Sequence, residues 1–383
     1  MKTILIVTIL VLLIVFLVNY GIDYCFYLKN RYCRFHIGRW DKETWEEAIE
    51  KIARKWLRRT PTVKITDNSR YILLDIINGK YRSSTIQSWQ KAALILGLLN
   101  SNNLESQEEA KEAVEKLIDS TGNWKNAPVA VDCGMLSYAV LKAASNTLKI
   151  KPAMDYSIGI IKKNINEKGM VSYTGGIDNP DMYVDTIGLV CPFLALYAKL
   201  YNNSEWEDIA FYQIKVFHQY GLYQDTALPN HAFHIETKLP LGVYGWGRGT
   251  AWYLIGLMDT YEHLQNEEYK NCCRKWIFEA AEKYVVYQRE DGGFGATLQR
   301  MQTYDSSATA AIAWFYSCCY KIWPNEKYKQ ITERCMRKLL LCTRISGAID
   351  WCQGDTQDIG VFAQTYDVMP FAQGMALRAL YQK

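Results

Sequence analysis

Apolar residues recur at helical spacing along almost the whole chain after Trp40. Residues three and four apart share one face of a helix, so this pattern predicts helices, and no strand-like alternation of similar length competes with it. The predicted helices are Trp45–Arg58, Ile86–Leu99, Gln107–Ile118, Met135–Ala144, Thr186–Leu200, Trp206–His218, Ala251–His263, Tyr269–Tyr287, Ser307–Tyr320 and Tyr328–Thr343. The sequence therefore predicts an all-α protein.

Short turns of similar composition, each starting at a glycine, separate many of these helices. The turns begin at Gly79, Gly122, Gly169, Gly221, Gly292 and Gly347. They recur at intervals of roughly fifty residues, which is the length of a repeated two-helix unit. No terminal repeat is polar on its outer face, which favours closure over an open solenoid. Six closed units would make a toroid of inner and outer helices.

The inner helices of such a toroid should be apolar nearly all round. The segments Ala92–Leu99 and Ile187–Leu194 fit this expectation. Pro192 lies inside the second segment, so a kink or an early break is expected there. The glycine turns would gather at one rim, where a pocket lined by aromatic rings can form.

The first apolar segment has a different character. Thr3–Ile22 carries no charge and is long enough to cross a bilayer of about 30 Å. No small-residue cleavage signature follows it, which indicates a retained membrane anchor rather than a removed signal peptide. The predicted organisation is an anchor at 1–22, a juxtamembrane linker at 23–44 and one barrel domain at 45–383.

Basic residues are more frequent after the anchor than before it. Lys29, Arg31, Arg34 and Arg39 follow it, whereas Lys2 and the amino terminus precede it. Because basic flanks tend to stay in the cytoplasm, this asymmetry slightly favours a cytoplasmic location for the domain that follows.

Composition narrows the classes of function. The 44 basic and 40 acidic side chains nearly balance, and no long basic block appears, so nucleic acid is not an expected partner. The 27 Tyr and 12 Trp residues suit the lining of a carbohydrate cleft. The eleven cysteines are odd in number and contain no C-x-x-C pair, which favours neither a disulfide framework nor a structural zinc site.

The run Trp246-Gly247-Arg248-Gly249-Thr250-Ala251-Trp252 stands at the start of a predicted helix. Its glycines let the backbone approach a ligand, Arg248 can hold a carboxylate through two parallel hydrogen bonds, and Trp252 can stack beside it. These features predict a site for an acidic, flat-faced molecule such as a sugar acid. In the alternative interpretation Trp246 and Trp252 are core anchors and Arg248 is solvated.

Three acids, Asp132, Asp185 and Asp305, directly precede apolar helices, and each could serve only as an N-cap. Asp185 differs because it follows Met182 and Tyr183 and has other apolar neighbours. Such surroundings disfavour ionisation and raise the pKa of a carboxyl, and a carboxyl that stays partly protonated can act as a general acid.

The segment His231-Ala232-Phe233-His234-Ile235-Glu236 holds two histidines and a carboxylate. Its spacing does not place these groups on one helix face, so a metal site is not predicted. A role for His231 in hydrogen bonding to a sugar is favoured.

Two of these motifs resemble a known family, the unsaturated glucuronyl and rhamnogalacturonyl hydrolases of glycoside hydrolase families 88 and 105. Tyr183-Val184-Asp185-Thr186, followed by Pro192-Phe193-Leu194-Ala195, resembles the family's acid-bearing strip, and Trp246–Trp252 matches its Trp-Gly-Arg-Gly-x-x-Trp signature. Weaker matches are Val131–Gly134, Asn230–Phe233 and Asp305–Ala310. The resemblance covers about residues 45–380 and implies an (α/α)6 barrel.

The resemblance also implies a reaction. Asp185 would act as general acid and base on a 4,5-unsaturated uronic acid at the non-reducing end of an oligosaccharide, by protonating C4 so that water adds at C5. Asp132 would hold substrate hydroxyls or the water, Arg248 would orient the substrate beside Trp252, and His231 would line the pocket. Tyr183 and Trp246 complete the expected substrate-binding residues. Neither a metal nor a cofactor is expected.

The chain departs from the family pattern at several positions. Thr250 and Ala251 replace an Asn-Gly pair, Tyr183 stands where Trp is common, and His234 stands where an acid is frequent. Two alternatives therefore stay open: an inverting glycosidase that uses Asp132 and Asp185 on saturated substrates, and a non-catalytic, membrane-tethered glycan-binding protein.

Overall fold

In the computed structural model, which describes residues 1–61, 63–82, 88–223 and 225–382, six inner helices form a closed ring. They are α4 (Ser88–Leu99), α6 (Cys133–Ala143), α8 (Val184–Tyr201), α10 (Gly247–His263), α12 (Ser306–Ile322) and α14 (Pro370–Leu380). Each inner helix packs against the next one, and α14 packs against α4. The predicted closure is therefore confirmed.

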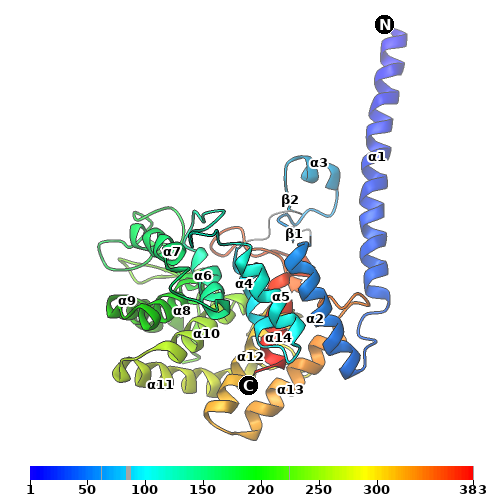
Figure 1. Cartoon of the computed structure of the whole chain (residues 1–383). Coiled ribbons are helices and arrows are strands. Elements are labelled where there is room, and N and C mark those ends of the chain that lie inside the picture. Colours follow the sequence, from blue (N-terminus) through cyan, green and yellow to red (C-terminus); the bar gives the residue numbers. More distant parts are fainter. Residues whose placement is uncertain (62, 83–87, 224, 383) are drawn as a thin grey trace.

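An outer layer of helices surrounds this ring (Figure 1). Its members are α2 (Lys42–Arg58), α5 (Leu104–Glu115), α7 (Lys151–Lys163), α9 (Ser204–Tyr220), α11 (Glu267–Tyr284) and α13 (Glu326–Leu341), with the 3-10 turn η1 (Val285–Tyr287) after α11. Outer and inner helices alternate along the chain, so the inner helices run parallel and begin at one rim. The predicted (α/α)6 barrel is confirmed.

The helix boundaries agree with the apolar periodicity for most of the barrel. The helices α7 and α14 were not predicted individually, and positions 86 and 87 of the predicted helix Ile86–Leu99 lie outside the described residues. The expected break at Pro192 is wrong, because α8 continues to Tyr201. Close packing on nearly all sides of α8 holds the helix together although Pro192 lacks an N–H group.

Five of the six glycines that begin the predicted turns have a positive φ angle, whereas Gly221 has a φ of −90°. Gly122, Gly169 and Gly347 have φ angles of +87°, +76° and +87°. Each sits inside a small antiparallel bridge that follows an outer helix. A residue with a Cβ atom would be strained at such angles, so glycine is required to lead the chain from an outer helix back to the inner rim.

Asparagine caps start several outer helices. Asn103, Asn203, Asn266 and Asn325 each accept a hydrogen bond from the backbone N–H two residues later. This bond satisfies one of the free donors at the helix start, which explains where these helices begin after polar turns.

Glycines allow α8 and α10 to approach closely. A Cβ atom on Gly256 would lie 2.2 Å from the carbonyl oxygen of Ile187, and one on Gly188 would lie 2.6 Å from that of Trp252. Backbone atoms cannot move aside easily, so these contacts fix the spacing of the two helices. Asp185 and Arg248 are carried by the first turns of the same pair.

Short strands connect the helices. They are β1 (Val63–Lys64), β2 (Tyr81–Arg82), β3 (Asp181–Tyr183), β4 (Leu222–Tyr223), β5 (Leu228–Pro229), β6 (Ala232–His234), β7 (Pro240–Leu241), β8 (Gly295–Thr297), β9 (Arg300–Tyr304), β10 (Cys352–Gln353) and β11 (Tyr366–Asp367). All pairings are antiparallel, and β6 lies between β3 and β7.

The N-terminal helix α1 (Lys2–Phe35) stands apart from the barrel over most of its length (Figure 1). It is long and apolar enough to cross a membrane, and its most apolar window is not buried. The helix α8 also passes the same test of length and composition, but it is buried in the barrel core. The stretch predicted as a linker, 23–44, is helical up to Phe35, and α2 begins at Lys42.

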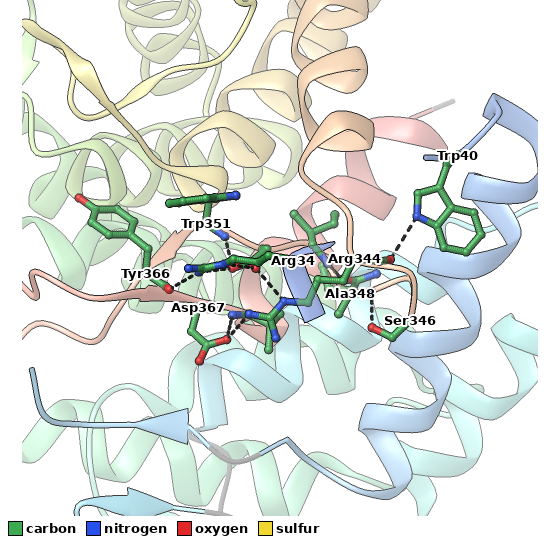
Figure 2. A network of polar contacts seen from close by, with 12 residues as sticks. Arg34, Trp40, Arg344, Ser346, Ala348, Trp351, Tyr366 and Asp367 are labelled. Carbon is green, nitrogen blue, oxygen red and sulfur yellow. Dashed lines mark hydrogen bonds and ion pairs between the residues drawn. The ribbon is translucent and has the colours of Figure 1, made fainter. Parts of the chain in front are cut away.

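The end of α1 is held on the barrel by a polar network (Figure 2). Arg34 donates from Nε and Nη2 to the Asp350 carboxylate, at 2.7 and 2.9 Å, and from Nη2 to the carbonyl of Tyr366 at 2.7 Å. Arg344 donates to the same carboxylate at 2.7 Å and to Asp367 at 2.8 Å. Burial alone would raise the pKa of Asp350, but the two guanidinium groups lower it, so the network contains a buried carboxylate.

Candidate active site

The start of α8 brings Asp185 and His231 together. Tyr183 of β3 pairs with Ala232 of β6, and the N–H of Val184 donates to the carbonyl of His231 at 2.9 Å. Asp185 follows within the first turn of the helix. The strand pair thus fixes the distance between the two side chains, and His231 Nε2 lies 3.6 Å from Asp185 Oδ2.

Asp185 is a poorly hydrated carboxyl group. Its side chain is 12% exposed, and Oδ2 is a buried atom without a hydrogen-bond partner among the described residues. Burial raises the pKa of Asp185 to about 7, although the charge of Arg248 and a backbone hydrogen bond oppose this rise. The protonation state of Asp185 therefore changes near neutral pH. A group that both donates and accepts a proton during a reaction needs a pKa in this range.

His231 is neutral at this pH. Burial and the nearby charge of Arg248 lower the pKa of His231 to about 4. The N–H of Gly360 donates to His231 Nδ1 at 3.3 Å, so the ring proton sits on Nε2. The N–H of His231 consequently faces the unpartnered oxygen of Asp185, and the pair is a neutral donor beside a carboxyl rather than an ion pair.

Arg248 is buried at the start of α10, only 2% exposed. Its Nη1 donates to the carbonyl of Gln353 at 2.7 Å and its Nη2 to that of Gly354 at 2.6 Å, with a longer bond to Thr356 Oγ1 at 3.3 Å. The two terminal nitrogens of Arg248 thus bind backbone carbonyls at the end of β10 and in the loop after it. The sequence predicts that the same nitrogens bind a substrate carboxylate. The positive charge of Arg248 still acts on both Asp185 and His231.

Asp132 lies at the start of α6, next to α8 in the ring. Its side chain does not cap the helix, and Ser88 Oγ donates to Oδ2 at 3.0 Å. Burial raises the pKa of Asp132, while the Ser88 hydrogen bond opposes the rise. Asp132 is therefore a half-buried carboxyl whose helix does not depend on it for capping.

The hydroxyl group of Tyr173 is influenced by the charges of both Asp185 and Asp132. Burial, followed by the charges of Asp185 and Asp132, raises the pKa of Tyr173 well above its usual value. The ring of Tyr173 lies 5.6 Å from that of Tyr183, which in turn lies 5.9 Å from that of His231. Sequence reasoning missed Tyr173, although it ends one of the glycine turns that were predicted to reach the rim.

The indole of Trp246 packs against the side chains of the site. It lies 4.6 Å from the His231 ring and 5.1 Å from that of Phe362, and its Nε1 donates to Gln353 Oε1 at 3.1 Å. Arg248 lies over the same indole at 5.4 Å. Because Trp246 is only 2% exposed, it orients His231 and Arg248 and leaves little ring surface for a sugar.

Trp252 is placed in the barrel core. It is 2% exposed, with its ring 5.4 Å from Trp89 and 4.8 Å from Phe371. Gly188 leaves room for it on α8. The structure does not bring Trp252 into the cluster around Asp185, so Trp252 is a core anchor, as the alternative interpretation of the motif expected. The solvated Arg248 of that interpretation is wrong, because Arg248 is buried.

Asp305 serves as the N-cap of α12. Its carboxylate accepts from the backbone N–H groups of Ser307 and Gln353, both at 3.0 Å. His234 and Glu236 point to other partners, Thr237 and Lys168. Within the described part of the chain no group of three or more His, Cys, Asp or Glu side chains could hold a metal ion.

The loop between β10 and β11 was also missed by sequence reasoning. It contributes the carbonyls held by Arg248, the Gly360 N–H on His231 and the Phe362 ring. Asp355 in this loop raises the pKa of Asp185 further. The loop is irregular, so no periodic pattern marked it in advance.

Fold and site together define a class: an (α/α)6 barrel with a carboxyl of raised pKa at the rim where its inner helices begin. The model of glycosyl hydrolase family 88 matches residues 48–382, and the chain belongs to this family of glycoside hydrolases. A search of curated proteins found no match.

Solved structures share the fold at low sequence identity. A possible member of family GH105 from Salmonella enterica has a TM-score of 0.73 and 16% identity, with 90% of this chain and 94% of that chain covered. An unsaturated glucuronyl hydrolase from Streptococcus agalactiae has a TM-score of 0.65 and 18% identity, covering 90% and 92%. One from Bacillus sp. GL1 has a TM-score of 0.61 and 15% identity, covering 87% and 94%.

Proposed function

We propose that this glycoside hydrolase acts on 4,5-unsaturated uronic acid residues at the non-reducing end of oligosaccharides. The observation that carries the proposal is the Asp185 carboxyl, buried, with one unpartnered oxygen and a pKa of about 7. Membership in family 88 and the resemblance in fold to proteins named unsaturated glucuronyl hydrolases support it.

In the proposed reaction Asp185 delivers its proton to C4 of the enol ether, and positive charge develops at C5. Water adds at C5 and returns a proton to the Asp185 carboxylate. The resulting hemiketal collapses, which opens the ring and releases the aglycone with its oxygen. A single acid of raised pKa suffices for both proton transfers, so the reaction requires neither a covalent intermediate nor a metal.

The neighbouring groups have distinct roles in this proposal. The Nε2–H of His231 faces the carboxyl and orients it, while Arg248 attracts the acidic sugar through its charge and stabilises the carboxylate formed after proton transfer. Asp132 holds substrate hydroxyls or the water, and Tyr183 lines the pocket. Trp252 supports the site only through core packing.

We further propose that α1 anchors the protein in a membrane. Its most apolar window is unburied, and basic residues follow it, a pattern that favours a cytoplasmic barrel. The substrate would then be an acidic oligosaccharide available at that membrane.

A second candidate is an inverting glycosidase acting on saturated substrates. The pKa values of both Asp132 and Asp185 are raised by burial at the starts of adjacent inner helices, which suits an acid and base pair. Such a mechanism requires two carboxyls about 6.5–9.5 Å apart across the substrate. A third candidate is a non-catalytic glycan-binding protein. It is favoured because the terminal nitrogens of Arg248 already donate to the backbone carbonyls of Gln353 and Gly354.

The test uses the full chain with a panel of lyase-generated oligosaccharides and their saturated counterparts. Loss of the ultraviolet absorbance of the enol ether by the unaltered enzyme, and a loss of activity of about 10³-fold in Asp185→Asn, would support the proposal. Asp225→Asn, at an exposed carboxyl, is the matched control and should keep full activity. Release of an inverted saturated sugar would select the second candidate, and binding without turnover the third.

A further inference from the structure

A cavity of about 870 Å³ lies between α1 and the barrel. Its lining combines the segment of α1 after the apolar stretch, the end of α2 and the loops that carry β10 and β11. The basic lining residues are Lys29, Arg31, Arg34, Lys55, Arg59 and Arg344. We call this cavity the α1 groove.

The α1 groove carries a net positive charge from its remaining basic residues, because Arg34 and Arg344 are already paired with the buried Asp350 carboxylate. Among the described residues that line it, Asp23 and Asp367 are the acidic ones, and both have partners. Asp23 accepts from the backbone N–H groups of Tyr71 and Ile72 at 2.9 and 3.0 Å, and Asp367 accepts from Arg344 at 2.8 Å. Lys55 on α2 and Arg59 directly after it are both exposed, and both line the groove.

The groove begins where the predicted membrane span ends. With a rise of 1.5 Å per residue, the segment of α1 from residue 22 to Arg34 is about 18 Å long, so it passes through a headgroup layer of about 5–8 Å and extends into the water beyond it. Tyr24 and Tyr27 are exposed along this part of α1, and Tyr20 is exposed just before it. Tyrosine side chains are typical of the membrane interface.

The short helix α3 (Ile72–Ile77) lies at the height along α1 where the groove begins. It lies beside the middle of α1, away from the barrel helices (Figure 1), and the two hydrogen bonds that Asp23 accepts from the N–H groups of Tyr71 and Ile72 hold its start there. Ile72 is buried, but Leu74 and Ile77 are 50% and 71% exposed, and Tyr71, directly before the helix, is 60% exposed. Apolar side chains at this level suit contact with lipid rather than water.

We propose that the α1 groove binds the phosphate-bearing headgroup of an anionic membrane lipid, while α3 contacts the acyl region beside it. Arginine and lysine side chains hold a phosphate by charge-assisted hydrogen bonds, and basic pockets at the cytoplasmic face of a membrane recognise such headgroups. The bound lipid would also contact the loop after β10, which Arg248 holds, and would thereby orient the barrel relative to the bilayer. This inference rests on the proposed anchoring by α1 but not on the proposed reaction.

The test measures retention of lipid by the detergent-solubilised full chain in native mass spectrometry, with phosphatidylglycerol and phosphatidylcholine titrated separately. We expect selective binding of phosphatidylglycerol, weakened about 30-fold in Lys55→Gln/Arg59→Gln, because each basic residue near an anionic surface contributes about 1 kcal/mol. The control Lys162→Gln/Lys163→Gln removes the same charge from the exposed end of α7 and should bind normally. Circular dichroism melting verifies that both variants fold.

Equal retention of the two lipids, or equal binding by the two double variants, would overturn the inference. Displacement of the lipid by millimolar inorganic phosphate would assign the groove to free anions, and displacement by an acidic oligosaccharide would assign it to the substrate. Failure of the full chain to remain with membranes in an alkaline wash would refute the anchor and, with it, the lipid site. Lipid selectivity in detergent does not depend on turnover, so failure of the proposed reaction is seen separately.

Discussion

Replacing Asp185 by Asn should stabilise the folded protein at alkaline pH while it abolishes activity. The pKa of Asp185 rises from an ordinary value of 3.8 to about 7 because the carboxyl is buried. Between these pH values the folded protein keeps a proton that the unfolded chain has lost, so the stability of the unaltered protein falls as the pH rises through this window. Asn carries no charge at any pH and does not show this loss.

The magnitude follows from the two pKa values. A pKa difference of one unit corresponds to about 1.4 kcal/mol, so ionised Asp185 destabilises the folded state by on the order of 4 kcal/mol above pH 7. For a barrel of this size, with an unfolding entropy of about 2.1 cal/mol/K per residue, this corresponds to a difference in melting temperature of about 6 °C.

Melting temperatures of the unaltered protein, Asp185→Asn and the surface control Asp225→Asn would be compared at pH 5 and pH 9. The advantage of Asp185→Asn should be about 4 °C larger at pH 9 than at pH 5, because about two of the three pKa units lie above pH 5, and the control should show no such difference. A difference that does not change with pH would refute the assignment of a buried carboxyl of raised pKa.

Three further predictions concern the same site and the packing of the barrel helices. The rate of hydrolysis should fall about tenfold for each pH unit above 7, because Asp185 must be protonated, and a pH profile of kcat/KM checks this. Arg248→Met should move this decline to higher pH, because it removes a positive charge that lowers the pKa of Asp185. Arg248→Lys should leave the decline in place and speed hydrogen exchange in the loop after β10. An unshifted pH profile in the Met variant would contradict this reasoning. Gly256→Ala should destabilise the barrel by a few kcal/mol in a denaturation series, since its Cβ would meet backbone, while Gly159→Ala, with open space around it, should stabilise by up to about 1 kcal/mol.

Much of the fold could be predicted from local pattern. The apolar periodicity and the glycine turns indicated a closed ring of helical pairs, because both signals arise within a single repeat. The pairing of Asp185 with His231 and Arg248 could be expected only from the family resemblance, since the three side chains come from distant parts of the chain.

What could not be predicted depends on tertiary contacts. The fork of Arg248 is filled by carbonyls more than a hundred residues away, and Trp252 is buried because Gly188 on another helix makes room for it. The helix α1 continues to Phe35, where Arg34 binds Asp350 near the other end of the sequence. None of these contacts leaves a periodic signal.

The most direct test of the proposed reaction is a rapidly quenched single turnover in deuterated water, with the product examined by nuclear magnetic resonance. Protonation of the enol ether by Asp185 predicts one deuterium at C4 and a carbonyl at C5, with the released aglycone keeping its glycosidic oxygen. A product without deuterium at C4, in which the double bond between C4 and C5 is retained, would contradict the account.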